Sequence, residues 1–165
     1  MNLVISLLVA ALFTFAGWVA QTPRGDFVIT IDAPSHGRTR VECVEGCAAL
    51  VGSRDIGLHR DGKIHLPTAS YGVYCSGPGV ERCRAAFHGF LKDDVAGSAP
   101  AQRGDFVINV EAPGGETTLE CVEGCAALVG ARDISTYRGE GRGTTYVFSC
   151  GGSRCEATFH GFLKR

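Results

Sequence analysis

Glu42-Cys-Val-Glu-Gly-Cys-Ala-Ala-Leu-Val-Gly52 is the stretch that decides the fold, because it recurs without a change at 120–130. It carries two cysteines, and each copy has a second cysteine pair further along the chain. Two more segments recur on either side of it: Arg24-Gly-Asp-Phe-Val-Ile29 as 103–108, and Phe87-His-Gly-Phe-Leu-Lys92 as 159–164. Several segments that recur in one order identify an internal repeat.

The repeat sets the predicted domain boundaries. The first copy spans 24–92 and the second spans 103–165. Between them, 93–102 is polar, contains small residues and a proline, and has no apolar period, which is typical of a linker. The sequence therefore predicts two small domains in tandem, each expected to fold on its own.

Apolar and polar residues alternate within each copy, and this period of two predicts β-strands. The residues of the first copy that are expected to point inward are Phe27, Ile29, Ile31, Val41, Cys43, Tyr71, Val73, Cys75, Cys83, Phe87 and Leu91, with equivalents in the second copy. The segments 48–55 and 126–133 fit either a short helix or a further strand. The predicted fold class is all-β, with two tandem, disulfide-stabilised antiparallel domains.

Eight cysteines, four in each copy, are expected to form disulfides rather than to bind zinc. A zinc site needs close spacing in both halves of its ligand set, whereas the second pair has a different spacing in each copy. Gly46 and Gly124 suit three-residue hairpin loops, which favours local bonds. These bonds would join Cys43 to Cys47, Cys75 to Cys83, Cys121 to Cys125, and Cys150 to Cys155.

Other connectivities stay open at this point. A bond that closes about 40 residues constrains the unfolded chain by about 4 kcal/mol, which is more than a short loop contributes. Four cysteines allow three pairings, and the sequence alone does not choose between them.

The N-terminal segment indicates export. Residues 2–20 are predominantly apolar and carry no charge, which is typical of a signal peptide, predicted at 1–20. An uncleaved anchor is the alternative, because roughly 18 apolar residues reach the lower limit for spanning a bilayer. After cleavage no membrane insertion is expected, and the disulfides fit an extracytoplasmic location, either secreted or periplasmic.

Charge gives no indication of a nucleic-acid partner. The chain has 16 basic and 17 acidic residues and a net charge of −1, and no stretch is dominated by one sign. The predicted partner is instead a protein or polysaccharide of the cell envelope.

His88, Phe90, His160 and Phe162 are the predicted binding residues. They alternate with the inward residues of the last strand in each copy, so they are expected on its exposed face. The alternative is that they cover their own sheet or the sister repeat. No nucleophile, acid–base pair, metal set or cofactor motif accompanies them, so no catalytic residue, metal or cofactor is predicted.

The predicted function is therefore an exported, non-catalytic binding or cell-surface module, in which two tethered faces increase avidity. A small inhibitor of an extracytoplasmic enzyme, acting through the loops at 57–70 or 135–144, is the alternative. A hydrolase is less well supported, because no acid–base constellation is recognisable.

Overall fold

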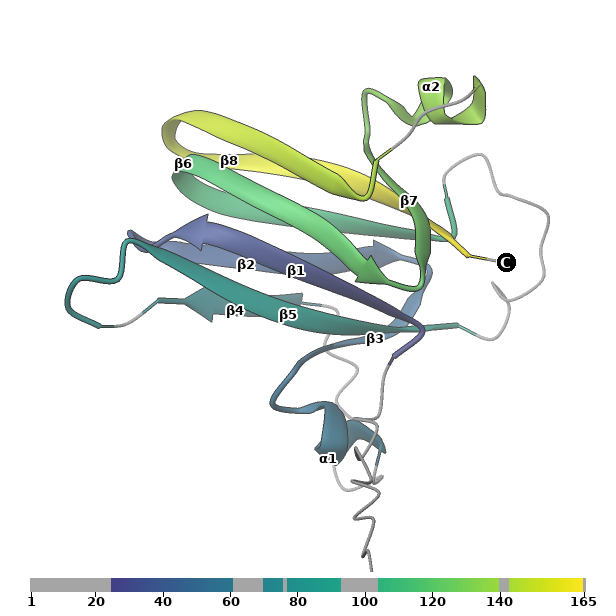
Figure 1. Cartoon of the computed structure of the whole chain (residues 1–165), viewed down its shortest axis with the longest axis horizontal. Coiled ribbons are helices and arrows are strands. Elements are labelled where there is room, and N and C mark those ends of the chain that lie inside the picture. Colours follow the sequence, from purple (N-terminus) through teal and green to yellow (C-terminus); the bar gives the residue numbers. More distant parts are fainter. Residues whose placement is uncertain (1–24, 61–69, 76, 93–103, 140–142, 165) are drawn as a thin grey trace, which may run out of the picture.

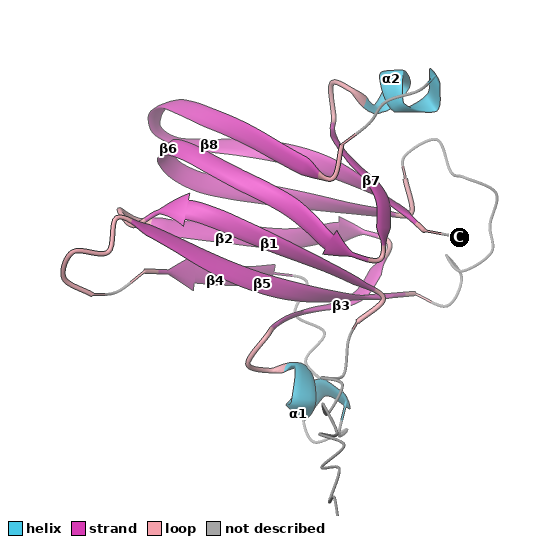
Figure 2. Cartoon of the chain, in the orientation of Figure 1, coloured by secondary structure: helices cyan, strands magenta, loops and turns pink. Residues whose placement is uncertain are grey.

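The computed structural model describes residues 25–60, 70–75, 77–92, 104–139 and 143–164. The predicted signal peptide at 1–20 and the predicted linker at 93–102 lie outside these residues. The described chain is all-β and antiparallel, with two short helices, as Figure 2 shows. The elements are β1 Phe27–Pro34, β2 Arg38–Glu45, β3 Cys47–Gly52, α1 Ile56–Arg60, β4 Ser70–Tyr74, β5 Arg82–Leu91, β6 Phe106–Glu123, β7 Cys125–Gly130, α2 Ile134–Gly139 and β8 Thr145–Leu163.

The predicted inward faces are confirmed. Phe27 and Ile29 are completely buried, and Ile31 and Phe87 are 1% exposed. The ambiguous segments form strands, β3 and β7, and each strand is followed by a turn and a short helix. Burial of alternate residues along each strand thus produces one apolar face, as a period of two requires.

Strands of the two copies pair with one another. β1 lies between β5 of its own copy and the second half of β6, where Ile31 is opposite Leu119. β2 lies between β4 and the first half of β6, where Val41 is opposite Val110. Equivalent residues therefore form equivalent pairs, because the first strand of each copy pairs with the second strand of the other.

The paired strands fold into two layers. The sheet is continuous, but β6 passes from one layer to the other near Gly115, where the pairing with β8 shifts register. One layer contains β3, β5, β1, the second half of β6 and the first half of β8. The other contains β4, β2, the first half of β6, the second half of β8 and β7. In Figure 1, β1 and β5 lie in front of β2 and β4.

A single core fills the space between the layers. Phe27 of β1 and Phe106 of β6 hold equivalent positions in the two copies, and their rings stack with centroids 3.8 Å apart. The buried cluster around them takes residues from both copies, including Leu50 and Leu128. The expectation of two separately closed domains is therefore corrected: the all-β, disulfide-rich class is right, but neither copy encloses a core of its own.

All four disulfides join the layers, and their pairing is the local one. Cys43 bonds Cys47 and Cys121 bonds Cys125, each across a tight turn. Gly46 and Gly124 occupy these turns with φ of 85° and 83°, as predicted. The predicted hairpins are wrong, because β2 does not pair with β3, nor β6 with β7. The other two bonds, Cys75 with Cys83 and Cys150 with Cys155, lie at the opposite ends of the strands. Because each bond begins in one layer and ends in the other, both ends of the sandwich are cross-linked.

Candidate functional site

The four predicted binding residues lie on the predicted strand face, but that face is covered. His88 is 9% exposed, and His160 and Phe162 are each 8% exposed. The Phe90 ring is half-buried and lies 4.3 Å from the ring of His59, measured between centroids. The prediction of an exposed face is therefore wrong, although the strand register behind it is right.

The short helices provide this cover. Tyr137 of α2 packs on Phe162 with ring centroids 3.9 Å apart, and Ala127, Val129 and Ile134 complete a small apolar cluster. In the first copy, α1 brings His59 onto Phe90 in the same way. Figure 1 places α1 and α2 at opposite sides of the molecule. Phe90 and Phe162 are thus each covered by a helix residue, and the binding role of the four predicted residues stays a prediction.

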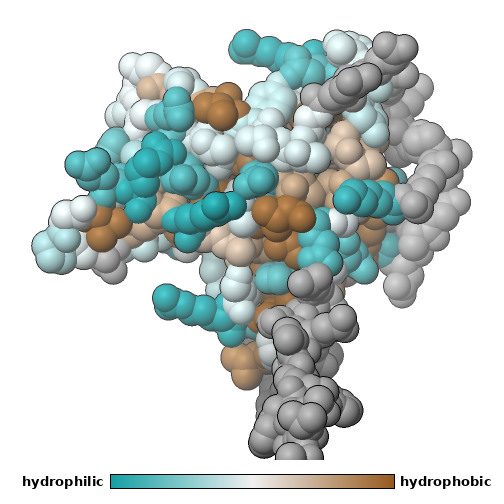
Figure 3. Space-filling view, in the orientation of Figure 1, coloured by the Kyte–Doolittle hydropathy of each residue, from teal (hydrophilic) through white to brown (hydrophobic). Residues whose placement is uncertain are grey.

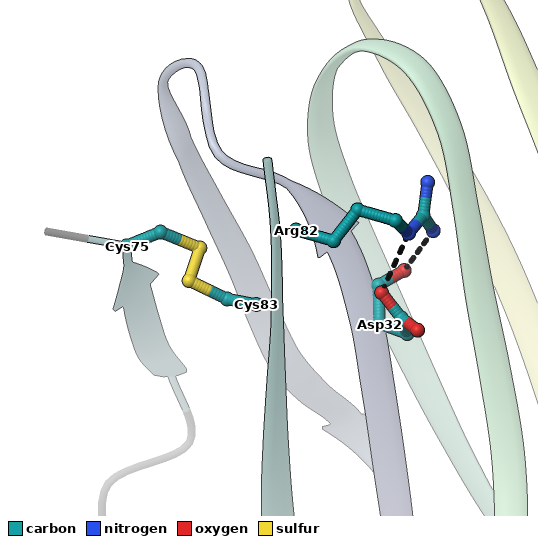
Figure 4. Close-up of a disulfide and its surroundings, with 4 residues drawn as sticks. All are labelled: Asp32, Cys75, Arg82 and Cys83. Carbon is teal, nitrogen blue, oxygen red and sulfur yellow. Dashed lines mark hydrogen bonds and ion pairs between the residues drawn. A yellow bond between two sulfur atoms is a disulfide. The ribbon is translucent and has the colours of Figure 1, made fainter. Parts of the chain in front are cut away.

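The described residues form a groove between β4 and β5. It encloses about 730 Å³ and begins at the disulfide that joins Cys75 to Cys83. Figure 4 shows this bond linking the two strands, while Arg82 points away from it to the Asp32 carboxylate. The Arg82 Nε lies 2.9 Å from Asp32 Oδ1, which ties this end of β5 to β1.

Aromatic side chains form the floor and the rim of this groove. The Tyr71 hydroxyl donates a hydrogen bond to the Asp55 carboxylate, and its ring contacts the edge of Phe87 at 5.4 Å between centroids. Tyr74 lies at the rim and is 69% exposed. The floor is therefore held in place by two contacts, and the rim offers an exposed ring.

Two charged residues, both cations, are among the described residues that line the groove. Arg54 follows β3, and Arg84 projects from β5. The Arg84 Nη2 donates to Thr30 Oγ1 at 3.3 Å and to Glu120 Oε2 at 2.9 Å. Because both of these bonds use Nη2, the Nε and Nη1 groups of the same guanidinium are left for another acceptor.

The second copy differs at the positions that form this groove. Val147 replaces Gly72, Ser149 replaces Tyr74, and Glu156 replaces Arg84 at the equivalent pairing positions. Arg132 is retained where the first copy has Arg54. The groove residues of the first copy are thus more basic than their counterparts, but they are not more aromatic, because Phe148 of the second copy replaces Val73. Sequence reasoning missed this, although the substitutions are visible when the copies are aligned.

The remaining motifs have structural roles. In both Arg-Gly-Asp segments the Asp carboxylate accepts a backbone hydrogen bond: Asp26 from Leu91 at 2.6 Å, and Asp105 from Leu163 at 2.7 Å. Among the first-copy histidines, His36 Nε2 lies 2.6 Å from the Gly114 carbonyl oxygen, His59 contacts Phe90, and His65 lies outside the described residues.

The residues that the structure describes contain no group of three or more His, Cys, Asp or Glu side chains suited to a metal ion. None of the helices within these ranges has the length and apolar character that crossing a membrane requires. Comparison with protein-family models, curated proteins and solved structures found no match to this chain.

Proposed function

We propose that this chain is an exported, non-catalytic binding module whose ligand surface is the groove between β4 and β5. The observation that carries the proposal is the groove itself, which places an exposed tyrosine and two arginines in a concavity of about 730 Å³. Concave surfaces that combine apolar area with a few polar groups are the usual ligand sites of proteins. Four disulfides fit an oxidising, extracytoplasmic compartment, secreted or periplasmic.

Rigidity supports this function. The groove is bounded by one disulfide and by the fixed ring of Tyr71, so a ligand would meet a largely preformed surface. A preformed surface loses little conformational entropy on binding. Figure 3 shows hydrophilic and hydrophobic residues mixed over the viewed face, so this face is not a single apolar patch of the kind that marks a large protein interface.

The test is binding of the mature protein to cell-envelope extracts, separated into protein and polysaccharide fractions. The double variant Gly72→Val/Tyr74→Ser introduces the residues of the second copy. The fold is expected to tolerate it, because the valine displaces only the flexible end of the Arg38 side chain. We expect at least one fraction to bind the native protein about tenfold more tightly than the variant, because the exposed ring is lost. Val147→Ala, in the second copy, is the control and should bind like the native protein. Equal binding by the double variant would place the ligand site elsewhere, and turnover of any bound component would contradict the non-catalytic assignment.

A small inhibitor is the second function that a particular observation favours. The loop between Cys75 and Cys83 is closed by a disulfide, and its Val80 side chain is 40% exposed. Ser35 donates a backbone hydrogen bond to Glu81 at 2.8 Å, which anchors one side of the loop. The loops expected for this role differ: parts of 57–70 and 135–144 form α1 and α2, and much of the rest lies outside the described residues.

A further inference from the structure

The groove of the first copy has the chemistry of a site for an acidic sugar polymer. Its lining includes Arg54 and Arg84, and no Asp or Glu is among the described residues that line it. A guanidinium binds a carboxylate through two parallel N–H donors, which gives geometric specificity as well as affinity. Arg54 can offer this pair of donors, whereas Arg84 offers single N–H donors, because each such pair includes the Nη2 group that Arg84 uses for Thr30 and Glu120.

A third cation lies beside the groove. The Arg38 guanidinium lies over Gly72, where a side chain on that glycine would overlap it. At the equivalent position the second copy has Glu116, which lies opposite Ser149 as Arg38 lies opposite Tyr74. Two of the basic positions at the first groove, Arg38 and Arg84, are therefore acidic in the second copy.

The aromatic and small residues suit a sugar ring. Tyr74 presents an amphipathic ring to solvent, which can pack against the C–H face of a sugar while its hydroxyl remains hydrated. Ala85 and Ala86 of β5 have small side chains, so a ligand can approach the backbone of this strand closely. The groove thus combines a stacking surface, reachable backbone groups and cations.

An extended peptide fits this groove less well. A strand inserted between β4 and β5 would need them about 9–10 Å apart, since neighbouring strands lie about 4.8 Å from each other. The Cα atoms of Cys75 and Cys83 are only 5.6 Å apart, so the disulfide end does not admit a strand. A polymer that lies along the rim avoids this restriction.

From these observations we infer that the first copy binds a carboxylated polysaccharide in this groove, while the second copy does not. The inference rests on the proposed function and gives it a ligand class. Arg54 and Arg84 bind carboxylates of the polymer, and Tyr74 stacks on one of its rings. Arg132 and Glu156 of the second copy offset each other in charge, and Ser149 offers no ring.

The test measures binding of the mature full-length protein to polygalacturonate, with dextran as the neutral polymer and dextran sulfate as a second polyanion. We expect polygalacturonate to bind, with an affinity that falls as salt is added. Dextran is expected to bind much more weakly. Arg54→Gln and Tyr74→Ser should each weaken polygalacturonate binding about tenfold, from the loss of one charged contact or of one stacking contact. Arg132→Gln and Ser149→Ala are the matched controls in the second copy and should leave the affinity unchanged.

Each other outcome separates this inference from the proposed function. In one outcome, dextran binds as tightly as polygalacturonate, and this binding is lost in Tyr74→Ser but kept in Arg54→Gln. This would overturn the inference that the ligand is carboxylated, while the groove would remain a binding site. In another outcome, Arg54→Gln and Arg132→Gln weaken polygalacturonate binding equally, and dextran sulfate binds as tightly as polygalacturonate. This would mean that polyanions adsorb over the whole surface, and it would overturn the inference of a carboxylate site in the groove. Binding of a protein or peptide alone, lost in Tyr74→Ser, would also overturn it. If no ligand depends on Tyr74, the proposed function fails as well.

Discussion

At the scale of single residues, two glycines and two phenylalanines set the spacing at the centre of the molecule. Phe27 lies opposite Gly89, and Phe106 lies opposite Gly161. A Cβ atom on either glycine would overlap the ring of the phenylalanine opposite it. Neither glycine has a positive φ, so close approach rather than backbone conformation requires them. The stacked pair of rings exists because both strands leave this space open.

Gly89→Ala is therefore expected to lower the free energy of unfolding by about 1–3 kcal/mol, the usual cost of overpacking a core. Phe27 would be displaced from its stack on Phe106, so part of the contact between the layers would be lost. Chemical denaturation with intact disulfides measures the change. Gly57→Ala is the control, because nothing lies within 4 Å of a Cβ there and alanine favours the helix. A neutral Gly89→Ala variant would show that the rings have room to move.

At the scale of elements, alternation predicted which strand face points inward but not what covers the other face. Phe87 and His88 alternate as expected, and the outer residue is nevertheless buried. On the same face, Phe90 and Phe162 are covered by helices of five and six residues. Such short segments contain too little apolar periodicity for reliable prediction, and their stability depends on packing rather than propensity. The groove could not be predicted either, since it depends on how β4 of one layer is placed relative to β5 of the other.

Phe162→Ser tests the cover in the second copy. Because Phe162 is buried against Tyr137, its loss should lower the free energy of unfolding by about 1.5–3 kcal/mol. Thermal or chemical unfolding measures this change, and amide exchange should show faster opening of α2. Phe90→Ser, at a half-buried site, is expected to cost less. An unchanged stability for Phe162→Ser would mean that α2 does not hold its place on the sheet.

At the scale of the whole molecule, the repeat in the sequence was visible, but the exchange of strands between copies was not. The first half of β6 has the same apolar pattern whether it pairs with the second strand of its own copy or with that of the other copy. This pattern consists of Val107, Ile108 and Val110. A local hairpin and an exchanged pair therefore have the same sequence signature. Topology decides between them, because β6 continues through Pro113 and Gly114 as one bent strand instead of turning back.

This exchange predicts that an isolated repeat has no complete core. Residues 103–165 alone would lose β1 and β2, which flank β6 on the side away from β8. Two copies of this fragment would restore both pairings, since Leu119 of one copy can stand opposite Val110 of the other, as Val41 does in the full chain. After oxidative refolding we expect a dimer, with the two Phe106 rings stacked at its centre.

Sedimentation equilibrium measures the mass of the fragment, and circular dichroism at decreasing concentration measures the coupling of folding to assembly. Because the monomer exposes half of a shared core, strand content should fall on dilution as the dimer dissociates. Mixing with the fragment 24–92 should give a heterodimer, since that fragment supplies the native β1 and β2. Phe106→Asp should abolish both assemblies, because it would place a charge in the central stack. A monomeric fragment 103–165 with a well-dispersed amide spectrum would show instead that each copy closes its own sheet, and that strand exchange is not required for folding.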